Sequence, residues 1–419
     1  MSGSGVQWDV DEAFEGSGDL DDAVNGLGVS PVFQPIVELP TGTTIGFEAL
    51  ARWPSQPHLG PQSVFAYAER TDRVTELDRL CIDRAVDVAL RGGLAEGALL
   101  GVNSEPASDY TCRADSEILQ RGHDRFALLF ELTERNLLGH LPALLRKVAA
   151  LRADGIAIAL DDVGANPESL ALLDIVEPEV IKLANRLIQE TPSVDTARIG
   201  AALTAHRERK GTLIVAEGIE TDEHLERALT WGACLGQGFL FGKPGPLPAD
   251  GYTAPWSAPK VSGVSAARFP TPFDVVATHP FVGQADTDTL TAISRHLEEQ
   301  ACTAPDTPMV LVAVQGAGDP GPSTQRRYSD LARACPLVAV FGDRLAAGQA
   351  PDVRTVPLDA VDPLRRQWVV VTLGPHTAAA LIARERGDGP ASDRRFDFVL
   401  THDRDLVAAA ATTLLGRVP

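Results

Sequence analysis

Apolar residues in the first part of the chain follow two alternating patterns. Short apolar runs, which predict strands, occur at 32–39, 44–53, 98–103, 126–132, 156–162, 180–184, 212–218 and 238–242. Amphipathic runs typical of helices separate most of them, most clearly at 73–90, 141–154, 195–209 and 222–232. Strands that alternate with helices predict a parallel α/β arrangement, and eight strands predict a TIM-like (β/α)8 barrel.

A stretch at 243–274 is rich in Pro, Gly, Ser and Ala, which is typical of a linker. Beyond it, strands are predicted at 308–315, 336–342, 368–374 and 396–403, and helices at 288–302, 323–335, 376–386 and 404–415. These patterns predict a second, smaller α/β domain. We therefore expect an acidic, flexible lead (1–28), the barrel (29–247), a linker (248–272) and the smaller domain (273–419).

Composition limits the compartment and the partners. The formal net charge is −20 over 419 residues, so the surface repels nucleic-acid polymers and anionic lipid. No apolar run is long enough to span a bilayer, and the acidic N-terminus lacks the apolar core of a signal peptide. The five cysteines form no CxxC pair, which fits a reducing compartment and argues against a thiolate zinc site. We expect a cytoplasmic protein without a membrane partner.

Two charged residues interrupt one of the predicted strands. Glu48 and Arg52 lie in GFEALARW, and the period of two of a strand directs both side chains to the same face. Buried charges are costly unless they pair or bind a metal. Two explanations are open at this point, a buried ion pair within the sheet or a metal ligand beside an anion-binding arginine.

Polar residues recur where the other predicted strands end. The set is Glu48, Asn103, Glu131, Asp161, Asp162, Lys182, Glu217 and Gln237. Strand ends of a parallel barrel open on one face, so these side chains are expected to converge. Taken singly, an acid at a strand end is commonly a cap, and a lysine in an apolar run commonly reaches the surface. Together they favour a site, because every strand would otherwise carry an unrelated polar residue at the same end.

The chemistry of this set points to divalent cations. Carboxylate and amide oxygens without thiolate or imidazole suit Mg²⁺, Mn²⁺ or Ca²⁺ rather than Zn²⁺. Crowded carboxylates repel one another unless cations lie among them. Two such ions, about 3.5–4 Å apart, are a common arrangement for cleaving phosphodiesters. Lys182 could then orient the attacking water or stabilise charge, and Arg52 could hold a phosphate.

Seven separated motifs carry a family resemblance over about residues 28–247: QPIV…GFEALARW, VNSEP, FELTE, ALDDVG, IKLA, AEGIET and GQGFLFGKP. They resemble the EAL-domain family of cyclic di-GMP phosphodiesterases. The resemblance implies a TIM-like barrel, often dimeric, that hydrolyses cyclic di-GMP to the linear dinucleotide pGpG with Mg²⁺ or Mn²⁺.

The resemblance also implies roles for individual residues. The metal ligands would be Glu48, Asn103, Glu131, Asp161, Asp162 and Glu217, with Glu217 also a candidate base. Lys182 would assist the attacking water, while Gln34, Arg52 and Gln237 would contact substrate or metal-bound water. Glu134 would anchor the loop that follows the two aspartates.

The segment after the aspartates departs from the family pattern. It is DDVGANPESL (161–170) where the family has DDFGTGYSSL, so Val163 and Pro167 replace aromatic residues and Asn166 replaces a glycine. Ala184 stands where the lysine motif of the family continues to an aspartate. Because all the implied ligands are intact, we expect hydrolysis. The alternative is a degenerate domain that acts as a cyclic di-GMP receptor or as an adaptor for a protein partner.

The smaller domain has no comparable set of polar residues. The segment THDRD (401–405), with His402, is compatible with a metal or phosphate site but is more typical of a helix N-cap. The arginine groups at 325–328, 364–368 and 393–398 are more typical of solvated or paired charges. The runs LVAVFGD, QWVVVTLGPHTAAALIA and DRRFDFVLTHDRDLV are similar to the DICT sensory domain. That similarity implies a regulatory or interaction module with an unidentified ligand.

Overall fold

Eight strands close into a barrel in chain order. They are β1 (Ser30–Glu38), β2 (Thr43–Arg52), β3 (Leu99–Ser104), β4 (Ala127–Leu132), β5 (Ala157–Val163), β6 (Val180–Leu183), β7 (Leu213–Ala216) and β8 (Leu235–Gly236). The computed structural model describes residues 17–133, 137–165, 167–248, 254–259, 269–304, 308–314, 322–342, 352–387 and 394–418. The predicted TIM-like barrel is therefore confirmed.

The barrel differs from the prediction in two respects. Strand β1 is antiparallel to both β2 and β8, whereas the neighbours from β2 to β8 pair in parallel. The strand predicted at 238–242 is wrong, because the eighth strand is the short segment Leu235–Gly236. The apolar run at 238–242 instead forms turns after β8, and Phe239 and Leu240 are exposed there.

Helices surround the barrel: α2 (Pro61–Arg70), α3 (Val74–Arg91), α4 (Glu117–Arg125), α5 (Leu141–Ala153), α6 (Pro167–Val176), α7 (Asn185–Gln189), α8 (Val194–Lys210) and α9 (Asp222–Thr230). Local sequence fixes several of their ends. Ser193 and Thr196 form a capping box that starts α8, and Gly211 ends it in the left-handed conformation at φ +77°. The four helices predicted in the barrel region, now α3, α5, α8 and α9, are confirmed.

The expected flexible lead contains ordered structure. Helix α1 (Ser17–Val24) buries Leu20, Ala23 and Val24 against the barrel, in a cluster that includes Trp53. The indole of Trp53 donates a hydrogen bond to the carbonyl of Ala23 at 3.3 Å. The spacing of its three apolar residues gives α1 one apolar face, which the acidic composition of the lead concealed. Residues 1–16 lie outside the described residues.

The second domain is a seven-stranded sheet in the order β12-β11-β10-β13-β14-β15-β9. The strands are β9 (Gly283–Asp286), β10 (Met309–Ala313), β11 (Val338–Gly342), β12 (Arg354–Pro357), β13 (Gln367–Leu373), β14 (Ala378–Glu385) and β15 (Arg395–Thr401). Its helices are α10 (Pro272–Val276), α11 (Thr287–Thr303), α12 (Pro322–Ala334) and α13 (Arg404–Leu415). Helices α11 and α12 pack together, as do α10 and α13.

The helix predicted at 376–386 is wrong, because this segment is β14. Strand β14 lies between β13 and β15, and its residues 379–383 are all buried. Two separate apolar clusters share them: Ala380 and Ile382 pack with α10 and α13, whereas Leu381 and Ala383 pack with α11 and α12. A strand covered on both faces is apolar at every position, so it lacks the alternation that distinguishes a strand in sequence.

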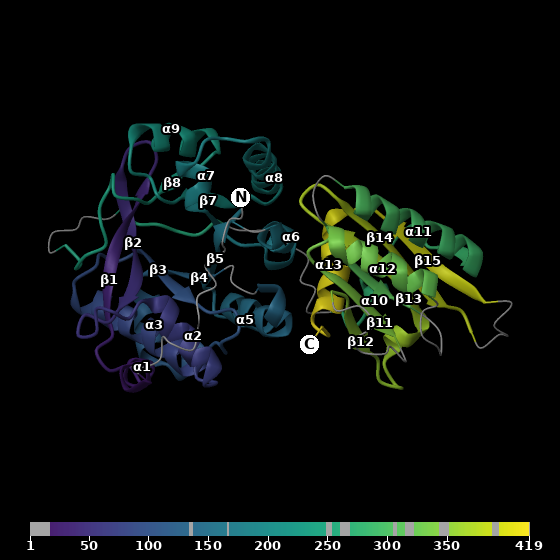
Figure 1. Cartoon of the computed structure of the whole chain (residues 1–419), viewed down its shortest axis with the longest axis horizontal. Helices are drawn as coiled ribbons and strands as arrows, with labels where there is room; N and C mark the ends of the chain where they lie inside the picture. Colours follow the sequence, from purple (N-terminus) through teal and green to yellow (C-terminus); the bar gives the residue numbers. More distant parts are fainter. Residues whose placement is uncertain are drawn as a thin grey trace, which may run out of the picture.

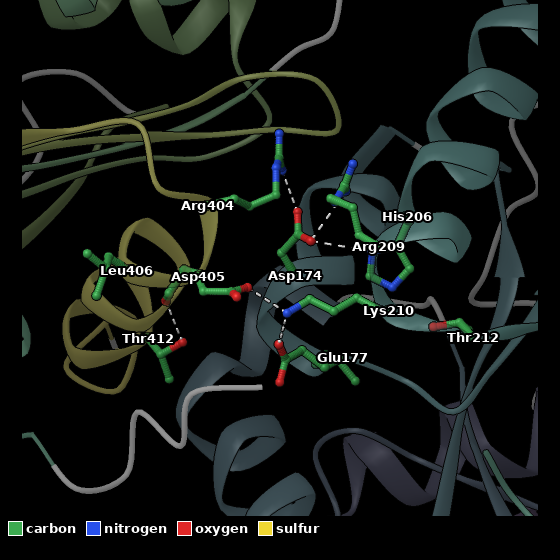
Figure 2. A network of polar contacts seen from close by, with 12 residues as sticks. Asp174, Glu177, His206, Arg209, Lys210, Thr212, Arg404, Asp405, Leu406 and Thr412 are labelled. Atoms are coloured by element: carbon green, nitrogen blue, oxygen red, sulfur yellow. Dashed lines mark hydrogen bonds and ion pairs between the residues drawn. The ribbon is translucent and has the colours of Figure 1, made fainter. Parts of the chain in front are cut away.

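The two domains lie side by side and meet where α13 faces α6 and α8 (Figure 1). Arg404 Nη1 lies 2.5 Å from Asp174 Oδ2, and Lys210 Nζ lies 2.6 Å from Asp405 Oδ1, as Figure 2 shows. Arg354 also donates to the carbonyl of Leu138 across the interface. Asp403 caps the N-terminus of α13, so the interpretation of THDRD as a helix start is confirmed. In the described ranges, no helix has both the length and the apolarity that crossing a membrane requires.

Candidate active site

Lys182 occupies the centre of a group of acidic side chains in the barrel. Its Nζ lies 2.6 Å from Glu131 Oε2 and 2.7 Å from Glu217 Oε1. Asp161 Oδ1 follows at 3.2 Å and Glu48 Oε2 at 3.4 Å. These residues come from β2, β4, β5, β6 and the end of β7, so the predicted convergence of strand-end residues is what the barrel produces. The lysine is 1% exposed, so it does not reach the surface.

Two amide side chains also donate hydrogen bonds to the Glu48 carboxylate. Asn103 Nδ2 donates to Glu48 Oε1 at 2.8 Å, and Gln237 Nε2 donates to Glu48 Oε2 at 2.7 Å. Gln237 Nε2 also lies 3.2 Å from Gln34 Oε1, and Gln34 Nε2 donates to the carbonyl of Gly242. The strand register supports this arrangement, because Gln34 of β1 lies opposite Glu48 of β2.

A glycine makes room for the most deeply buried acid. A Cβ atom on Gly101 of β3 would lie 2.1 Å from Glu131 Oε1, which is far inside van der Waals contact. Glu131 is fully buried. The absence of a side chain at Gly101 therefore lets the Glu131 carboxylate lie inside the barrel. The motif alone did not indicate this role, because LLGVN has the composition of an ordinary strand.

The lysine and the carboxylates shift one another's protonation. Burial raises the pKa of Glu217 to about 8, although Lys182 acts in the opposite direction. Burial and the nearby charge of Glu48 raise the pKa of Glu131 well above its usual range. Burial also opposes the charge on Glu48, but Lys182 and the hydrogen bonds from Gln237 and Asn103 outweigh it and lower the pKa. One ammonium group thus compensates only part of the negative charge.

The donor chemistry fits divalent cations. Among the described residues, no cluster of three or more Asp, Glu, His or Cys side chains has an arrangement that could hold a metal ion. The carboxylates instead point at Lys182. Even so, the site offers only carboxylate and amide oxygens, which Mg²⁺ and Mn²⁺ prefer. Glu131 Oε1 is also buried without a hydrogen-bond partner among the described residues, so it has unused capacity for a cation.

The loop after the aspartates is held by its neighbours. Asp162 is exposed and has a positive φ of 50°, which is uncommon for a residue with a side chain. The Gly164 amide donates to Ser169 Oγ at 3.2 Å, and Arg186 of α7 donates to the Gly164 carbonyl. Sequence reasoning did not single out Arg186. Asn166 and Glu134 lie outside the described residues, so the anchoring role of Glu134 stays a prediction.

A cavity of about 610 Å³ opens above the acidic group. Its lining includes the predicted residues Gln34, Glu48, Arg52, Asn103, Asp161, Glu217 and Gln237. Arg52 donates to the carbonyl of its neighbour Ala51 at 2.8 Å. Phe239, which is 52% exposed, and Phe65 also line the cavity and were not predicted as site residues. Aromatic rings at such an opening offer flat surfaces to a planar ligand.

Residues 17–244 match the family model of the EAL domain. The chain therefore belongs to the EAL-domain family, as its motifs led us to expect. Residues 275–386 match the model described as the sensory domain in diguanylate cyclases and two-component systems, DICT. Both resemblances drawn from the sequence are thus confirmed.

Several curated proteins are similar to the barrel region. The cyclic di-GMP phosphodiesterase RocR of Pseudomonas aeruginosa is 30% identical over 244 residues, which cover 54% of this chain and 60% of RocR. The probable cyclic di-GMP phosphodiesterase PdeG of Escherichia coli is 29% identical over 233 residues, 53% of this chain and 46% of PdeG. An uncharacterized protein of Sinorhizobium fredii is 30% identical over 225 residues, only 27% of its length. The chain thus spans between 27% and 60% of these relatives.

Solved structures are similar to the same region. The complex of the PaMucR phosphodiesterase with c-di-GMP is 28% identical with a TM-score of 0.48, and the match covers 55% of this chain and 97% of that one. The manganese and cy-diGMP complex of Klebsiella pneumoniae BlrP1 is 29% identical with a TM-score of 0.46, covering 52% of this chain and 57% of that one.

Proposed function

We propose that this protein hydrolyses cyclic di-GMP to pGpG, with two Mg²⁺ or Mn²⁺ ions at the acidic site. The observation that carries the proposal is the set of four carboxylates around Lys182 at the base of an open cavity. Membership of the EAL family and the similarity to named cyclic di-GMP phosphodiesterases support it.

Each residue has a proposed task. Glu48, Asn103, Glu131, Asp161, Asp162 and Glu217 would hold the ions, which when bound supply an activated water and neutralise the departing oxygen. Glu217 would accept the proton of the attacking water. Lys182, whose Nζ lies 2.7 Å from Glu217 Oε1, would orient that water and stabilise negative charge.

The cavity wall would position the substrate. Arg52, which lines the cavity, would hold a phosphate, while Gln34 and Gln237 present amide groups beside Glu48. Glu134 would anchor the loop after the aspartates. The protein would act in the cytoplasm, where its cyclic dinucleotide substrate is a soluble partner, and a homodimer formed through the EAL domain is part of the proposal.

We also propose that the DICT domain regulates the barrel. Asp161 and Asp162 lie near the end of β5, the loop that follows leads into α6, and Asp174 of α6 pairs with Arg404 of α13. A ligand or protein that binds the second domain could therefore shift α6 and the loop. The described residues of the second domain form no polar cluster comparable to the barrel site, so they do not identify this ligand or protein.

A non-catalytic receptor or adaptor is the second candidate function. The departures at Val163, Pro167 and Ala184, together with the exposed, positive-φ conformation of Asp162, favour it. In this case the cavity would bind cyclic di-GMP, and the altered loop after Asp162 would prevent turnover.

Turnover of cyclic di-GMP by the full chain separates the two candidates. Wild type is compared with Glu48→Gln, and the exposed Glu208→Gln on α8 serves as the matched control. We expect pGpG to form in Mn²⁺ or Mg²⁺, to disappear in EDTA, and to be lost in Glu48→Gln but not in Glu208→Gln. If the wild-type protein binds the nucleotide but forms no product, the receptor function is supported and the proposed hydrolysis is overturned.

A further inference from the structure

A second buried polar cluster includes Ser104, the residue that follows Asn103 in β3. Its members are Asp78 of α3, Ser104 at the end of β3, Ser108 and Lys147 of α5, and they are between 1% and 3% exposed. Charged residues are almost never buried to this degree unless they are paired and hydrogen-bonded. Ser104 lies in the motif VNSEP, but none of the seven motifs contains Asp78, Ser108 or Lys147, and the proposed reaction does not use the cluster.

Lys147 donates hydrogen bonds to the end of β3 and to the segment that follows it. Its Nζ donates to Ser104 Oγ at 2.9 Å, to the carbonyl of Glu105 at 2.5 Å and to Ser108 Oγ at 2.5 Å. The ammonium group also lies 3.5 Å from Asp78 Oδ2. All three protons of the ammonium thus have acceptors within one stretch of five residues, 104–108.

Asp78 accepts hydrogen bonds from the same stretch, residues 104–108. It accepts hydrogen bonds from Ser104 Oγ at 2.9 Å, from the Glu105 amide at 3.0 Å and from Ser108 Oγ at 2.5 Å. The backbone of Glu105 is therefore bound at its carbonyl by the lysine and at its amide by the aspartate. A segment fixed at both groups cannot rotate as a free loop would.

This fixed segment begins one residue after Asn103. The Asn103 amide nitrogen donates to Glu48 Oε1 at 2.8 Å, which leaves the carbonyl oxygen as the atom of that side chain suited to a cation. The cluster also borders the site itself, since Asp78, Ser104 and Glu105 line the same cavity as Glu48 and Asp161.

We propose that Asp78 and Lys147 are positioning residues, which as a buried pair fix segment 104–108 and thereby orient the Asn103 carboxamide toward the acidic site. This inference rests on the proposed function and adds two residues to it. Groups that orient metal ligands in this way commonly change metal affinity or activity about 10–100-fold when they are removed.

Attachment of the two helices does not account for the pair. Helix α3 already buries Leu77, Ile82 and Val86, and α5 buries Leu144, Val148 and Leu151. Well-packed apolar residues commonly stabilise such contacts as well as a buried ion pair does. An ion pair whose hydrogen bonds all end on one short segment is instead suited to fixing that segment.

The test measures Mn²⁺ binding to the full chain by calorimetry, without substrate, and then kcat and KM for cyclic di-GMP. Lys147→Met removes the ammonium, and Asp78→Asn/Lys147→Met removes both charges in case the single variant does not fold. Leu151→Ala is the matched control, because it weakens the core on the same helix. Melting temperatures identify the loss of stability in each variant.

We expect Mn²⁺ to bind about tenfold more weakly to both Lys147 variants, while Leu151→Ala binds Mn²⁺ as wild type does despite a lower melting temperature. Unchanged Mn²⁺ affinity, kcat and KM in the Lys147 variants would overturn the positioning role and leave the proposed function intact. A wild-type chain that binds neither Mn²⁺ nor cyclic di-GMP would overturn the proposed function, and the inference with it.

Discussion

Single residues decide whether the acidic site can form, and Gly101 is the clearest case. A Cβ atom built there would lie 2.1 Å from Glu131 Oε1, and Glu131 is fully buried. We expect Gly101→Ala to displace the Glu131 carboxylate, to lower kcat/KM at least about tenfold, and to cost about 1–3 kcal/mol of stability. Turnover assays and chemical denaturation measure the two effects.

Gly60→Ala is the control for Gly101→Ala. Gly60 lines the same cavity, but a Cβ built there meets no atom within 4 Å. This variant should keep wild-type turnover. Equal activity of the two variants would show that Glu131 can move, and that the tight contact at Gly101 does not matter.

The sequence could predict those site residues whose polarity contrasts with their surroundings. Glu131 and Asp161 follow apolar strand residues, and Lys182 interrupts such a run, so each is conspicuous. Gly101 and Lys147 are not, because a glycine in a strand and a lysine in an amphipathic helix are ordinary. Their roles depend on which strand lies beside β3 and on which face of α5 turns inward, and both are properties of the closed barrel.

At the scale of elements, α1 contributes to the edge of the site. Its residue Ala23 is fully buried, and the carbonyl of Ala23 accepts the hydrogen bond from Trp53, the neighbour of Arg52. We expect Ala23→Asp to detach α1, because a carboxylate there would be buried without a partner. Limited proteolysis should then cut within residues 17–28, and KM should rise because Arg52 loses the support of its neighbour.

Asp22→Ala provides the comparison for Ala23→Asp. Asp22 is the exposed neighbour of Ala23 on the same helix, so its loss should leave proteolysis and KM unchanged. Cleavage of Ala23→Asp at the wild-type rate would mean that α1 is not needed to keep this edge of the barrel together.

Amphipathic helices such as α3 and fully buried apolar strands such as β10 and β11 were predictable, whereas β14 and α7 were not. The amphipathic helix α3 was predicted to within one residue at each end. Strand β14 was mistaken for a helix because its alanines favour helices and both of its faces are covered. Helix α7 was missed because five residues are too few to show a helical period.

At the scale of the whole molecule, Asp174 joins the two domains. Burial alone would raise its pKa, but the neighbouring His206 ring and the guanidinium groups of Arg404 and Arg209 outweigh burial and lower the pKa to about 2. Figure 2 shows this group facing α13. Because the carboxylate is favoured in the folded state, it stabilises the fold above pH 4, and the contribution is lost as the pH falls toward 2.

We expect Asp174→Asn to be about 2 kcal/mol less stable than wild type at pH 5, since each pKa unit is worth about 1.4 kcal/mol. The difference should shrink toward zero near pH 2. Urea unfolding across this range measures it, with the exposed Asp195→Asn on α8 as the control. A difference that does not depend on pH would mean that the carboxylate charge is not what stabilises the interface.

The same variant tests regulation by the second domain. If α6 transmits a signal from α13 to the loop after Asp162, Asp174→Asn should change kcat of the full chain, although its side chain is not part of the cavity lining. An unchanged kcat, together with the expected loss of stability, would limit Asp174 to holding the domains together.

Residues 254–259, between the domains in the sequence, pack against the barrel. The Ala254 amide bonds to the carbonyl of Thr44 at 3.1 Å, and the Trp256 amide bonds to that of Gly97 at 2.9 Å. Ala254, Trp256 and Ala258 pack on the apolar residues that fill the barrel interior, such as Leu99 and Leu129. A truncated protein that ended at the last family motif would lose these contacts, so an isolated EAL domain should extend through residue 259.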